Sequence, residues 1–202
     1  RHYAASIEKL KHVCDARKGE PIFGMTMIIF KGRTILVADT NVEDFPSAKR
    51  LVEISKSCVR VSNLFGFDPK VAFLSHSTFG KPISRNTKHV RDAIEILKEE
   101  KVEFDFDGEM QPDVALNPIY QEIYPFSKIV GRANILIMPA LHSAAISTKL
   151  MKSFGGAKLI GPLLIGLDLP IEVAPLRSST SDILNLASIA AYSSDVIDYK
   201  KG

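Results

Sequence analysis

The sequence predicts an α/β fold in which a parallel or mixed sheet is covered by helices on both faces. Short apolar runs of strand length alternate with longer amphipathic segments between residues 70 and 160, which is the order of strand-helix-strand units with right-handed crossovers. Two β-rich runs, 21–30 and 33–38, precede them. With 202 residues, 46% of them hydrophobic, the chain can bury a core as one domain or two small ones.

The first part of the chain contains two predicted helices on either side of a hairpin. Residues 3–16 space apolar side chains at helical intervals and end before Gly19. Lys31-Gly32 separates the two β-rich runs, and glycine at such a position takes the positive φ of a tight turn. A second amphipathic helix begins at Pro46 and ends near Gly66.

The middle of the chain predicts a buried strand over 70–75 and a helix with its apolar face around Val90 to Leu97. A second strand ends near Phe106, where Gly108 permits a sharp turn before a helix that begins at Pro112.

The last part predicts strands at 134–138 and 157–160 around a helix over 141–154, so that three successive units favour a parallel sheet. Glycines and prolines interrupt residues 161–175, which suggests interdomain connections rather than strands, and a final helix covers 182–192.

Composition excludes several classes of function. The net charge of +3 is spread through mixed acids and bases without a basic block, so nucleic acid binding is unsupported. The longest apolar runs, such as 135–141, are too short to span a bilayer. Cys14 and Cys58 fall in predicted helices and indicate reduced thiols and a cytoplasmic location, with a lone disulfide as the alternative. The abrupt start at Arg1 suggests a fragment of a longer chain.

Polar side chains follow two predicted strands, and we expect them near one another because the carboxyl ends of parallel strands share the edge where ligands bind. The alternative is structural: the acids would cap a helix, and the hydroxyls would belong to an ordinary loop. The candidate ligand-binding residues are Ser75, Ser77, Thr78, Lys81, Glu109, Gln111 and Asp113.

Other sites receive less support. There is no Gly-x-Gly-x-x-Gly or Walker-type loop, and the histidines show no metal-binding spacing, so we predict no metal site. Ser77, His76 and Asp107 could form a catalytic triad, but no nucleophile elbow accompanies them. Ser179-x-x-Asp182 before an apolar helix matches a capping box.

Five motifs resemble, in order, those of the phosphotransacetylase (phosphate acetyl/butyryl transferase) family over essentially the whole chain. The likeness is closer to the phosphotransacetylase-like C-terminal domain of bacterial hybrid malic enzymes. It implies a two-lobed α/β architecture similar to isocitrate/isopropylmalate dehydrogenases, with a ligand cleft between lobes. The second lobe would cover about 66–160, and elements in 1–65 and 161–202 would join or complete the first. The motifs lie at 38–40, 71–80, 107–115, 131–139 and 160–162.

In the catalytic family, the resemblance implies acyl transfer between an acyl phosphate and coenzyme A. Asp182 falls on the family's thiol-activating aspartate, and Arg177 reaches the family's arginine after a one-residue gap. Leu176 would then replace a serine, and Ser153, beside Lys152, would replace a second arginine. Each lost preorganised donor costs about 3 to 4 kcal/mol of barrier, so little acyl transfer would remain.

We therefore expect a catalytically degenerate domain that binds acetyl-CoA as a regulatory effector and supports a homo-oligomer. Its partners would be the malic enzyme domains of the same polypeptide, and NAD(P) and a divalent metal would bind only there. One alternative is an active phosphate acetyltransferase that uses Asp182 and Arg177. Another is a scaffold for oligomerisation without ligand or turnover.

Overall fold

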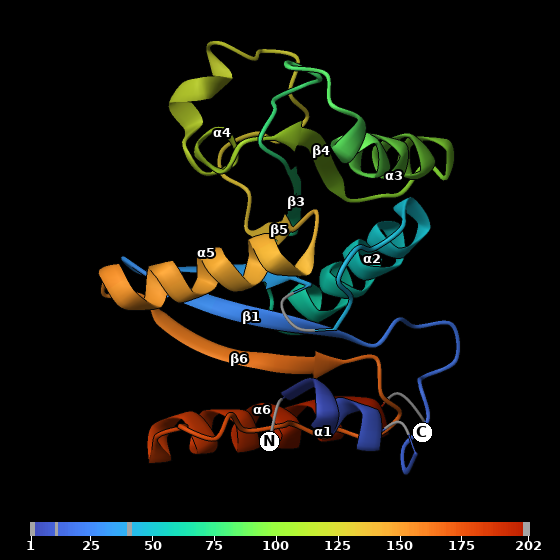
Figure 1. Cartoon of the computed structure of the whole chain (residues 1–202), viewed down its shortest axis with the longest axis vertical. Helices are drawn as coiled ribbons and strands as arrows, with labels where there is room; N and C mark the ends of the chain where they lie inside the picture. Colours follow the sequence, from blue (N-terminus) through green and yellow to red (C-terminus); the bar gives the residue numbers. More distant parts are fainter. Residues whose placement is uncertain (1–2, 11, 40–41, 200–202) are drawn as a thin grey trace.

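The computed structural model describes residues 3–10, 12–39 and 42–199. Its centre is one mixed six-stranded sheet with the strand order β4-β3-β5-β2-β1-β6, which runs from the top to the bottom of Figure 1. The strands are β1 (Phe23–Phe30), β2 (Arg33–Ala38), β3 (Lys70–Leu74), β4 (Asp105–Met110), β5 (Ile135–Ile137) and β6 (Lys158–Ile165).

The sheet combines a parallel part and an antiparallel part. Strands β4, β3, β5 and β2 are parallel neighbours, whereas β1 runs antiparallel to both β2 and β6. Strand β5 has only three residues and pairs with β3 on one side and β2 on the other. One sheet therefore continues across residue 66, and the division into two lobes stays a prediction.

Helices cover both faces of the sheet, as predicted. The hydrophobic cluster on one face joins the sheet to α2, α3 and α6, and the cluster on the other face joins it to α4 and α5. The helices are α1 (Tyr3–Leu10), α2 (Ala48–Leu64), α3 (Lys88–Glu99), α4 (Pro112–Leu116), α5 (Leu141–Phe154) and α6 (Thr180–Tyr199), with 3-10 turns at Arg85–Thr87 and Pro118–Gln121.

Strand residues alternate between the two hydrophobic clusters. In β3, Val71 and Phe73 belong to the cluster of α2 and α3, whereas Ala72 and Leu74 belong to the cluster of α4 and α5. Because successive side chains of a strand point to opposite faces, a strand covered on both faces needs apolar residues at every position. The continuous apolar run 71–74 therefore reflects burial in the centre of a three-layer structure.

Several predicted elements are confirmed. The helix over 141–154 and the strand over 33–38 match α5 and β2 at both ends, and Lys31 and Gly32 connect the hairpin with positive φ angles of 48° and 73°. The helix predicted from Pro46 begins at Ala48, because the Ser47 side chain accepts a hydrogen bond from the Arg50 amide.

The prediction for residues 157–175 was wrong in two respects. Strand β6 continues through Gly161-Pro162 to Ile165, and it is antiparallel to its neighbour β1. A proline is tolerated there because β6 is an edge strand, so its missing N–H need not meet a second neighbour. Gly161 is required because a Cβ atom would lie 2.9 Å from the Met25 carbonyl oxygen at its φ of 124°.

The predicted turn at Gly108 was also wrong, since β4 continues through this residue to Met110. Gly108 has a φ of 148°, and a Cβ atom would lie 2.7 Å from the Phe73 carbonyl oxygen. The pairing of β4 with β3 shifts at this point. The glycine thus permits an irregularity within the strand and not the end of the strand.

The terminal helices differ in length from their predictions. Helix α1 ends at Leu10, so Cys14 lies in the following turn, and α6 extends to Tyr199. Cys14 and Cys58 are both free thiols, and burial raises the pKa of Cys58 far above its ordinary value. Thr40, the last residue of the first family-like motif, lies outside the described residues. Among the described helices, none is long and apolar enough to cross a membrane.

Candidate functional site

The structure divides the predicted site residues between the two ends of the sheet (Figure 1). Ser75 to Lys81 follow β3, and Glu109 to Asp113 lie at the end of β4 and the start of α4. Arg177 and Asp182 lie near β6 and the start of α6. Strands β5, β2 and β1 separate β3 from β6, which corresponds to roughly 20 Å at about 4.8 Å per strand. The candidates therefore form two distinct sites.

The first group is organised around a buried carboxylate. Glu109 is 1% exposed, and its Oε1 accepts a hydrogen bond of 2.7 Å from the Ser77 hydroxyl. Arg91 Nη1 lies 3.0 and 3.1 Å from the two carboxylate oxygens and also donates to the Thr87 hydroxyl at 2.8 Å. Ser75 Oγ lies 3.0 Å from Ser77 Oγ. This cluster satisfies its own polar atoms, as burial requires.

The loop after β3 is likewise held by internal hydrogen bonds. The amides of Thr78 and Phe79 donate to the carbonyl oxygens of Lys81 and Glu109 at 3.1 and 2.7 Å. Gln111 Nε2 donates to the His76 carbonyl oxygen at 2.6 Å. Phosphate-binding loops instead aim several backbone amides at a common point. Ligand binding by this loop, by exposed Lys81 or by exposed Asp113 stays a prediction.

The catalytic triad of Ser77, His76 and Asp107, which already lacked support in the sequence, does not form. The Ser77 hydroxyl donates to Glu109, and the Asp107 oxygens accept from the Gly108 and Lys128 amides at 2.9 and 2.7 Å. The imidazole of His76 is thus neither bonded to the hydroxyl nor oriented by the carboxylate. No group of side chains in the described part of the chain could hold a metal ion.

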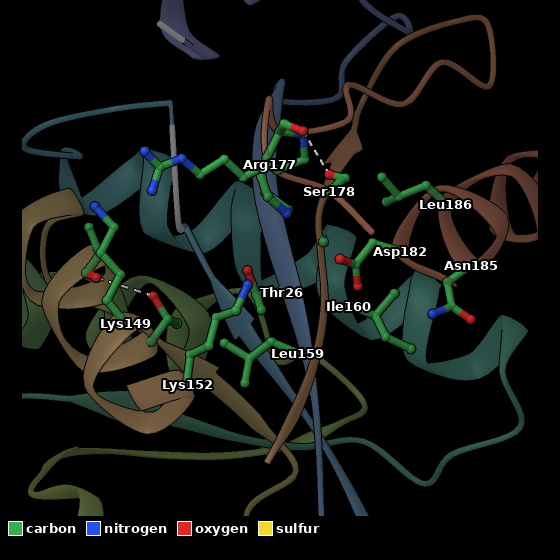
Figure 2. A pocket seen from close by; sticks show the side chains of 15 residues that line it. Thr26, Lys149, Lys152, Leu159, Ile160, Arg177, Ser178, Asp182, Asn185 and Leu186 are labelled. Atoms are coloured by element: carbon green, nitrogen blue, oxygen red, sulfur yellow. Dashed lines mark hydrogen bonds between the residues drawn. The ribbon is translucent and has the colours of Figure 1, made fainter. Parts of the chain in front are cut away.

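The second group lines a pocket of about 220 Å³ between α5, β6 and α6. Figure 2 shows Lys149 and Lys152 from α5 on one side, Asp182 and Asn185 from α6 on the other, and Arg177 above them. The lining residues are Thr26, Ala145, Thr148, Lys149, Lys152, Leu159, Ile160, Gly161, Pro162, Pro175, Arg177, Ser178, Asp182, Asn185 and Leu186.

Three cationic side chains converge on this pocket. Lys149 and Lys152 are three residues apart and therefore share a face of α5, and Arg177 comes from the segment before α6. None of the three forms an ion pair with a carboxylate in the parts of the chain that the structure describes. One carboxylate, Asp182, also lines the pocket, so the three cations leave an excess of positive charge that can bind a phosphate or another anion.

Asp182 occupies the first turn of α6, where it closes a capping box with Ser179. The Ser179 amide donates to Asp182 Oδ2 at 2.9 Å, and the Asp182 amide donates to Ser179 Oγ at 3.2 Å. Hydrogen bonding from the Ser179 backbone amide and then from its side chain lowers the pKa of the Asp182 carboxyl, and the nearby positive charges of Lys152 and Lys158 lower it further. The predicted capping role is confirmed, and Asp182 is a carboxylate at neutral pH.

The departures from the family motif are visible in the same region. Leu176, which stands where the family has a serine, is 89% exposed and is not among the pocket residues. Ser153, which stands where the family has a second arginine, is exposed, whereas its neighbour Lys152 lines the pocket. Positive charge is therefore kept on α5, but a lysine lacks the bidentate fork of a guanidinium.

Sequence reasoning missed several polar residues of these sites, among them Arg91, Lys149, Thr26 and Asn185. Arg91 could have been paired with Thr87, because residues four apart share a helix face. Thr26 lies where the pairing of β1 with β6 shifts between Met25 and Met27. No local sequence pattern predicts that shift, so Thr26 could not be assigned to the pocket from the sequence. The residues that line the pocket come from four segments of the chain, so they could be identified only from the tertiary structure.

The fold and this pocket together define an α/β protein of the phosphotransacetylase fold. A phosphotransacetylase from Streptococcus pyogenes superimposes with a TM-score of 0.88 at 30% identity, over 96% of this chain and 60% of that chain. Residues 1–191 match the model of the phosphate acetyl/butaryl transferase family, and the chain belongs to that family.

Curated relatives include two kinds of enzyme. The NADP-dependent malic enzyme of Rhizobium meliloti (strain 1021) is 43% identical over 192 residues, which is 95% of this chain and 25% of that protein. The phosphate acetyltransferase of Bacillus subtilis (strain 168) is 35% identical over 155 residues, 76% of this chain and 48% of that protein. The chain thus spans about a quarter of the malic enzymes it matches, and the resemblance seen in the motifs is confirmed.

Proposed function

We propose that this chain is the phosphotransacetylase-like C-terminal domain of a malic enzyme, that it no longer catalyses acyl transfer, and that it binds acetyl-CoA as a regulatory effector. The observation that carries the proposal is the pocket in which three cations, Lys149, Lys152 and Arg177, outnumber the one carboxylate, Asp182, which is held in a helix cap. Such a pocket favours binding of an anion over activation of a thiol.

Binding is supported by the charge of the pocket. Coenzyme A carries phosphate groups, and lysine and arginine side chains bind phosphate through charge-assisted hydrogen bonds. The cations come from two separate segments, α5 and the residues before α6. A ligand that bridges them would connect the two segments, so binding can bias their relative arrangement.

Loss of catalysis is supported by the state of Asp182 and by its neighbours. A carboxylate with a lowered pKa is a weak base toward a thiol, whose ordinary pKa is about 8.5. Ser153 stands where the family has an arginine, its neighbour Lys152 supplies only a point charge, and Leu176 supplies no hydroxyl. Each missing donor removes about 3 kcal/mol of transition-state stabilisation.

Regulation would follow from thermodynamic linkage. If acetyl-CoA binds one arrangement of the whole malic enzyme more tightly, it changes the affinity of the enzyme for malate, and malate changes the affinity for acetyl-CoA by the same factor. The rate of oxidative decarboxylation would change with the population of that arrangement. NAD(P) and a divalent metal would act in the remaining domains. Oligomerisation through this domain is part of the proposal, and sedimentation of the isolated chain would detect it.

The test combines two measurements on the purified chain. Calorimetry should detect saturable binding of acetyl-CoA that weakens as salt is raised. A coupled assay with acetyl phosphate and coenzyme A should show a turnover rate far below about 1 to 10³ per second, which is the usual range of enzymes. Acetyl-CoA should also change the rate of the complete malic enzyme. Absence of binding to both the chain and the complete enzyme would refute the effector role.

The second candidate is an active phosphate acetyltransferase. It is favoured by the presence of Arg177 and Asp182 in one pocket and by the Bacillus subtilis relative. In this case Asp182 assists the thiol and Arg177 binds the phosphate. Turnover in the usual range, abolished by Arg177→Gln, would establish this function and exclude the degenerate one. A chain that neither binds nor turns over but still oligomerises would be a scaffold.

A further inference from the structure

A second hollow, of about 690 Å³, lies at the carboxyl ends of the parallel strands. It is bounded by the segments that follow β2, β3 and β5 and by the start of α3. None of the described residues that line it also lines the cationic pocket, and none is a ligand-binding candidate chosen from the sequence. The hollow is thus a separate feature of the molecule.

The connections of the sheet change sides at this hollow. Helix α2, which follows β2, and helix α3, which follows β3, belong to the hydrophobic cluster on one face of the sheet. Helix α5, which follows β5, belongs to the cluster on the other face. Because β5 lies between β3 and β2, the chain leaves its carboxyl end in the direction opposite to both neighbours. In open α/β sheets such a reversal opens a crevice, and ligands bind in that crevice.

Ring side chains form most of the wall of the hollow. Six of the nine described residues that line it carry a ring, namely Phe45, Pro46, His76, His89, Pro139 and His142. No aspartate, glutamate, lysine or arginine is among the nine. A wall of flat rings without carboxylates or ammonium groups suits a planar heteroaromatic ring, which gains dispersion and stacking energy against it.

The rings lie where a ligand can reach them. Phe45 is 71% exposed, and its ring centroid lies 5.5 Å from that of His142 at an interplanar angle of 48°. His76 and His142 are exposed as well. A planar ligand that covers Phe45 removes apolar surface from water, which favours binding.

Polar groups of the wall indicate which planar ring fits. His89 Nε2 donates to the Pro139 carbonyl oxygen at 2.9 Å, which fixes this imidazole in the wall. Asn86 is exposed and offers an amide donor and an amide acceptor side by side. An asparagine pairs in this way with N6 and N7 of adenine. Adenine therefore matches both the rings and the amide.

We propose that this hollow binds an adenine ring, which stacks on Phe45 and His142 while Asn86 pairs with its edge. The ring belongs either to a free adenine nucleotide or to the adenosine end of acetyl-CoA, and it is recognised by the same chemistry in both cases. His142 and Lys149 lie about two turns apart on one face of α5, so the hollow and the cationic pocket border the same helix.

The first test is an NMR titration of the whole chain with adenosine, which should bind saturably with a Kd of about 1 mM or tighter. Phe45→Ala should weaken this binding about tenfold, the contribution expected of one aromatic stacking partner. Phe154→Ala removes another exposed phenylalanine, outside the hollow, and should bind adenosine normally. Urea denaturation checks that both variants are folded.

The second test examines the edge of the ring. Inosine carries an oxygen in place of the N6 amino group, so it should bind about tenfold more weakly than adenosine. Asn86→Leu removes the amide with little change in size, and this variant should bind the two nucleosides equally.

Competition with acetyl-CoA identifies the source of the ring. If acetyl-CoA displaces adenosine, and Phe45→Ala weakens acetyl-CoA about tenfold, the ring belongs to coenzyme A. If adenosine and acetyl-CoA bind together, the ring belongs to a separate nucleotide. Either result supports adenine binding by the hollow.

Three results would overturn the inference: adenosine does not bind the unaltered chain, Phe45→Ala binds it as well as Phe154→Ala does, or inosine binds as well as adenosine. The inference and the proposed function can fail separately. A chain that binds acetyl-CoA but not adenosine keeps the effector role alone. A chain that binds adenosine but not acetyl-CoA keeps the adenine site alone.

Discussion

At the β4 end of the sheet Glu109 is buried against Arg91, whereas at the β6 end Lys149, Lys152 and Arg177 share a pocket with only one carboxylate, Asp182. The first region attracted attention in the sequence because polar residues follow two predicted strands, and the second because Arg177 and Asp182 fall on a family motif. The structure shows that charge in the first region is neutralised within the fold, whereas the second region keeps an excess of positive charge. The number of charged residues therefore says less about a binding site than whether each charge has a partner.

The largest test of this comparison removes the partner of Glu109. Arg91→Ala leaves a carboxylate that is 1% exposed without its cation, and we expect a loss of about 3 kcal/mol in the free energy of unfolding. Urea denaturation measures the loss. Lys98→Ala, which breaks an exposed pair with Glu95, should cost under about 1 kcal/mol. Equal losses in the two variants would show that the buried cluster is not structural.

The next test removes charge from the pocket. The double variant Lys152→Gln/Arg177→Gln should weaken acetyl-CoA binding by roughly a hundredfold, because each charge-assisted hydrogen bond contributes about 1.5 kcal/mol or more. Its unfolding free energy should change little. Lys88→Gln/Lys98→Gln makes the same change of charge on α3 and should bind normally. A stability loss as large as that of Arg91→Ala would mean that these cations serve the fold.

A third test uses Glu172, a largely buried carboxyl that lacks an ion pair within the described chain and accepts a hydrogen bond from the Leu164 amide at 2.9 Å. Burial raises its pKa from 4.5 to about 8. Between these values the unfolded chain loses the proton while the folded chain keeps it, so stability falls as pH rises toward 8. Glu172→Gln should flatten this profile and add on the order of 2 kcal/mol at pH 9. An unchanged profile would contradict the burial of this group.

The smallest expected effect concerns the capping box. Ser179→Ala removes a hydroxyl that accepts from the Asp182 amide, which should cost about 1 kcal/mol of unfolding free energy. Loss of that hydroxyl should also raise the pKa of Asp182 part of the way toward its ordinary value, because the hydrogen bond from the Ser179 backbone amide, the largest cause of the lowering, remains and only the side-chain contribution is lost. A titration followed by NMR measures the shift. Ser188→Ala on the same helix is the control.

Much of the fold could be predicted because its patterns are local. The helix Leu141–Phe154 and the strand Arg33–Ala38 show clear periodicity and clear ends, and the sequence gives both correctly. Strands β4 and β6 could not be predicted at full length, because Gly108 and Gly161-Pro162 resemble strand ends until a neighbouring backbone is known. In both places the strand continues through a glycine because the backbone of the neighbouring strand lies too close for any larger residue.

The candidate site was predicted less well than the fold, for a related reason. Arg177 and Asp182 were proposed from the family motif and do share a pocket. The hydroxyls after β3 were proposed from their composition, and composition cannot reveal that Ser77 is already bonded to Glu109. Asn185 had no signal at all, because an unsatisfied amide can be recognised only when its surroundings are known.

The brevity of β5 has a consequence for how the chain folds. Strands β2 and β3 lie on either side of Ile135–Ile137, so the sheet is incomplete until a segment about a hundred residues beyond β2 arrives between them. Contacts of such long sequence separation slow folding, because the entropy of closing the intervening loop is lost before the contact forms. The β1–β2 hairpin can form early, and insertion of β5 is then expected to be the slow event that unites the two halves of the sheet.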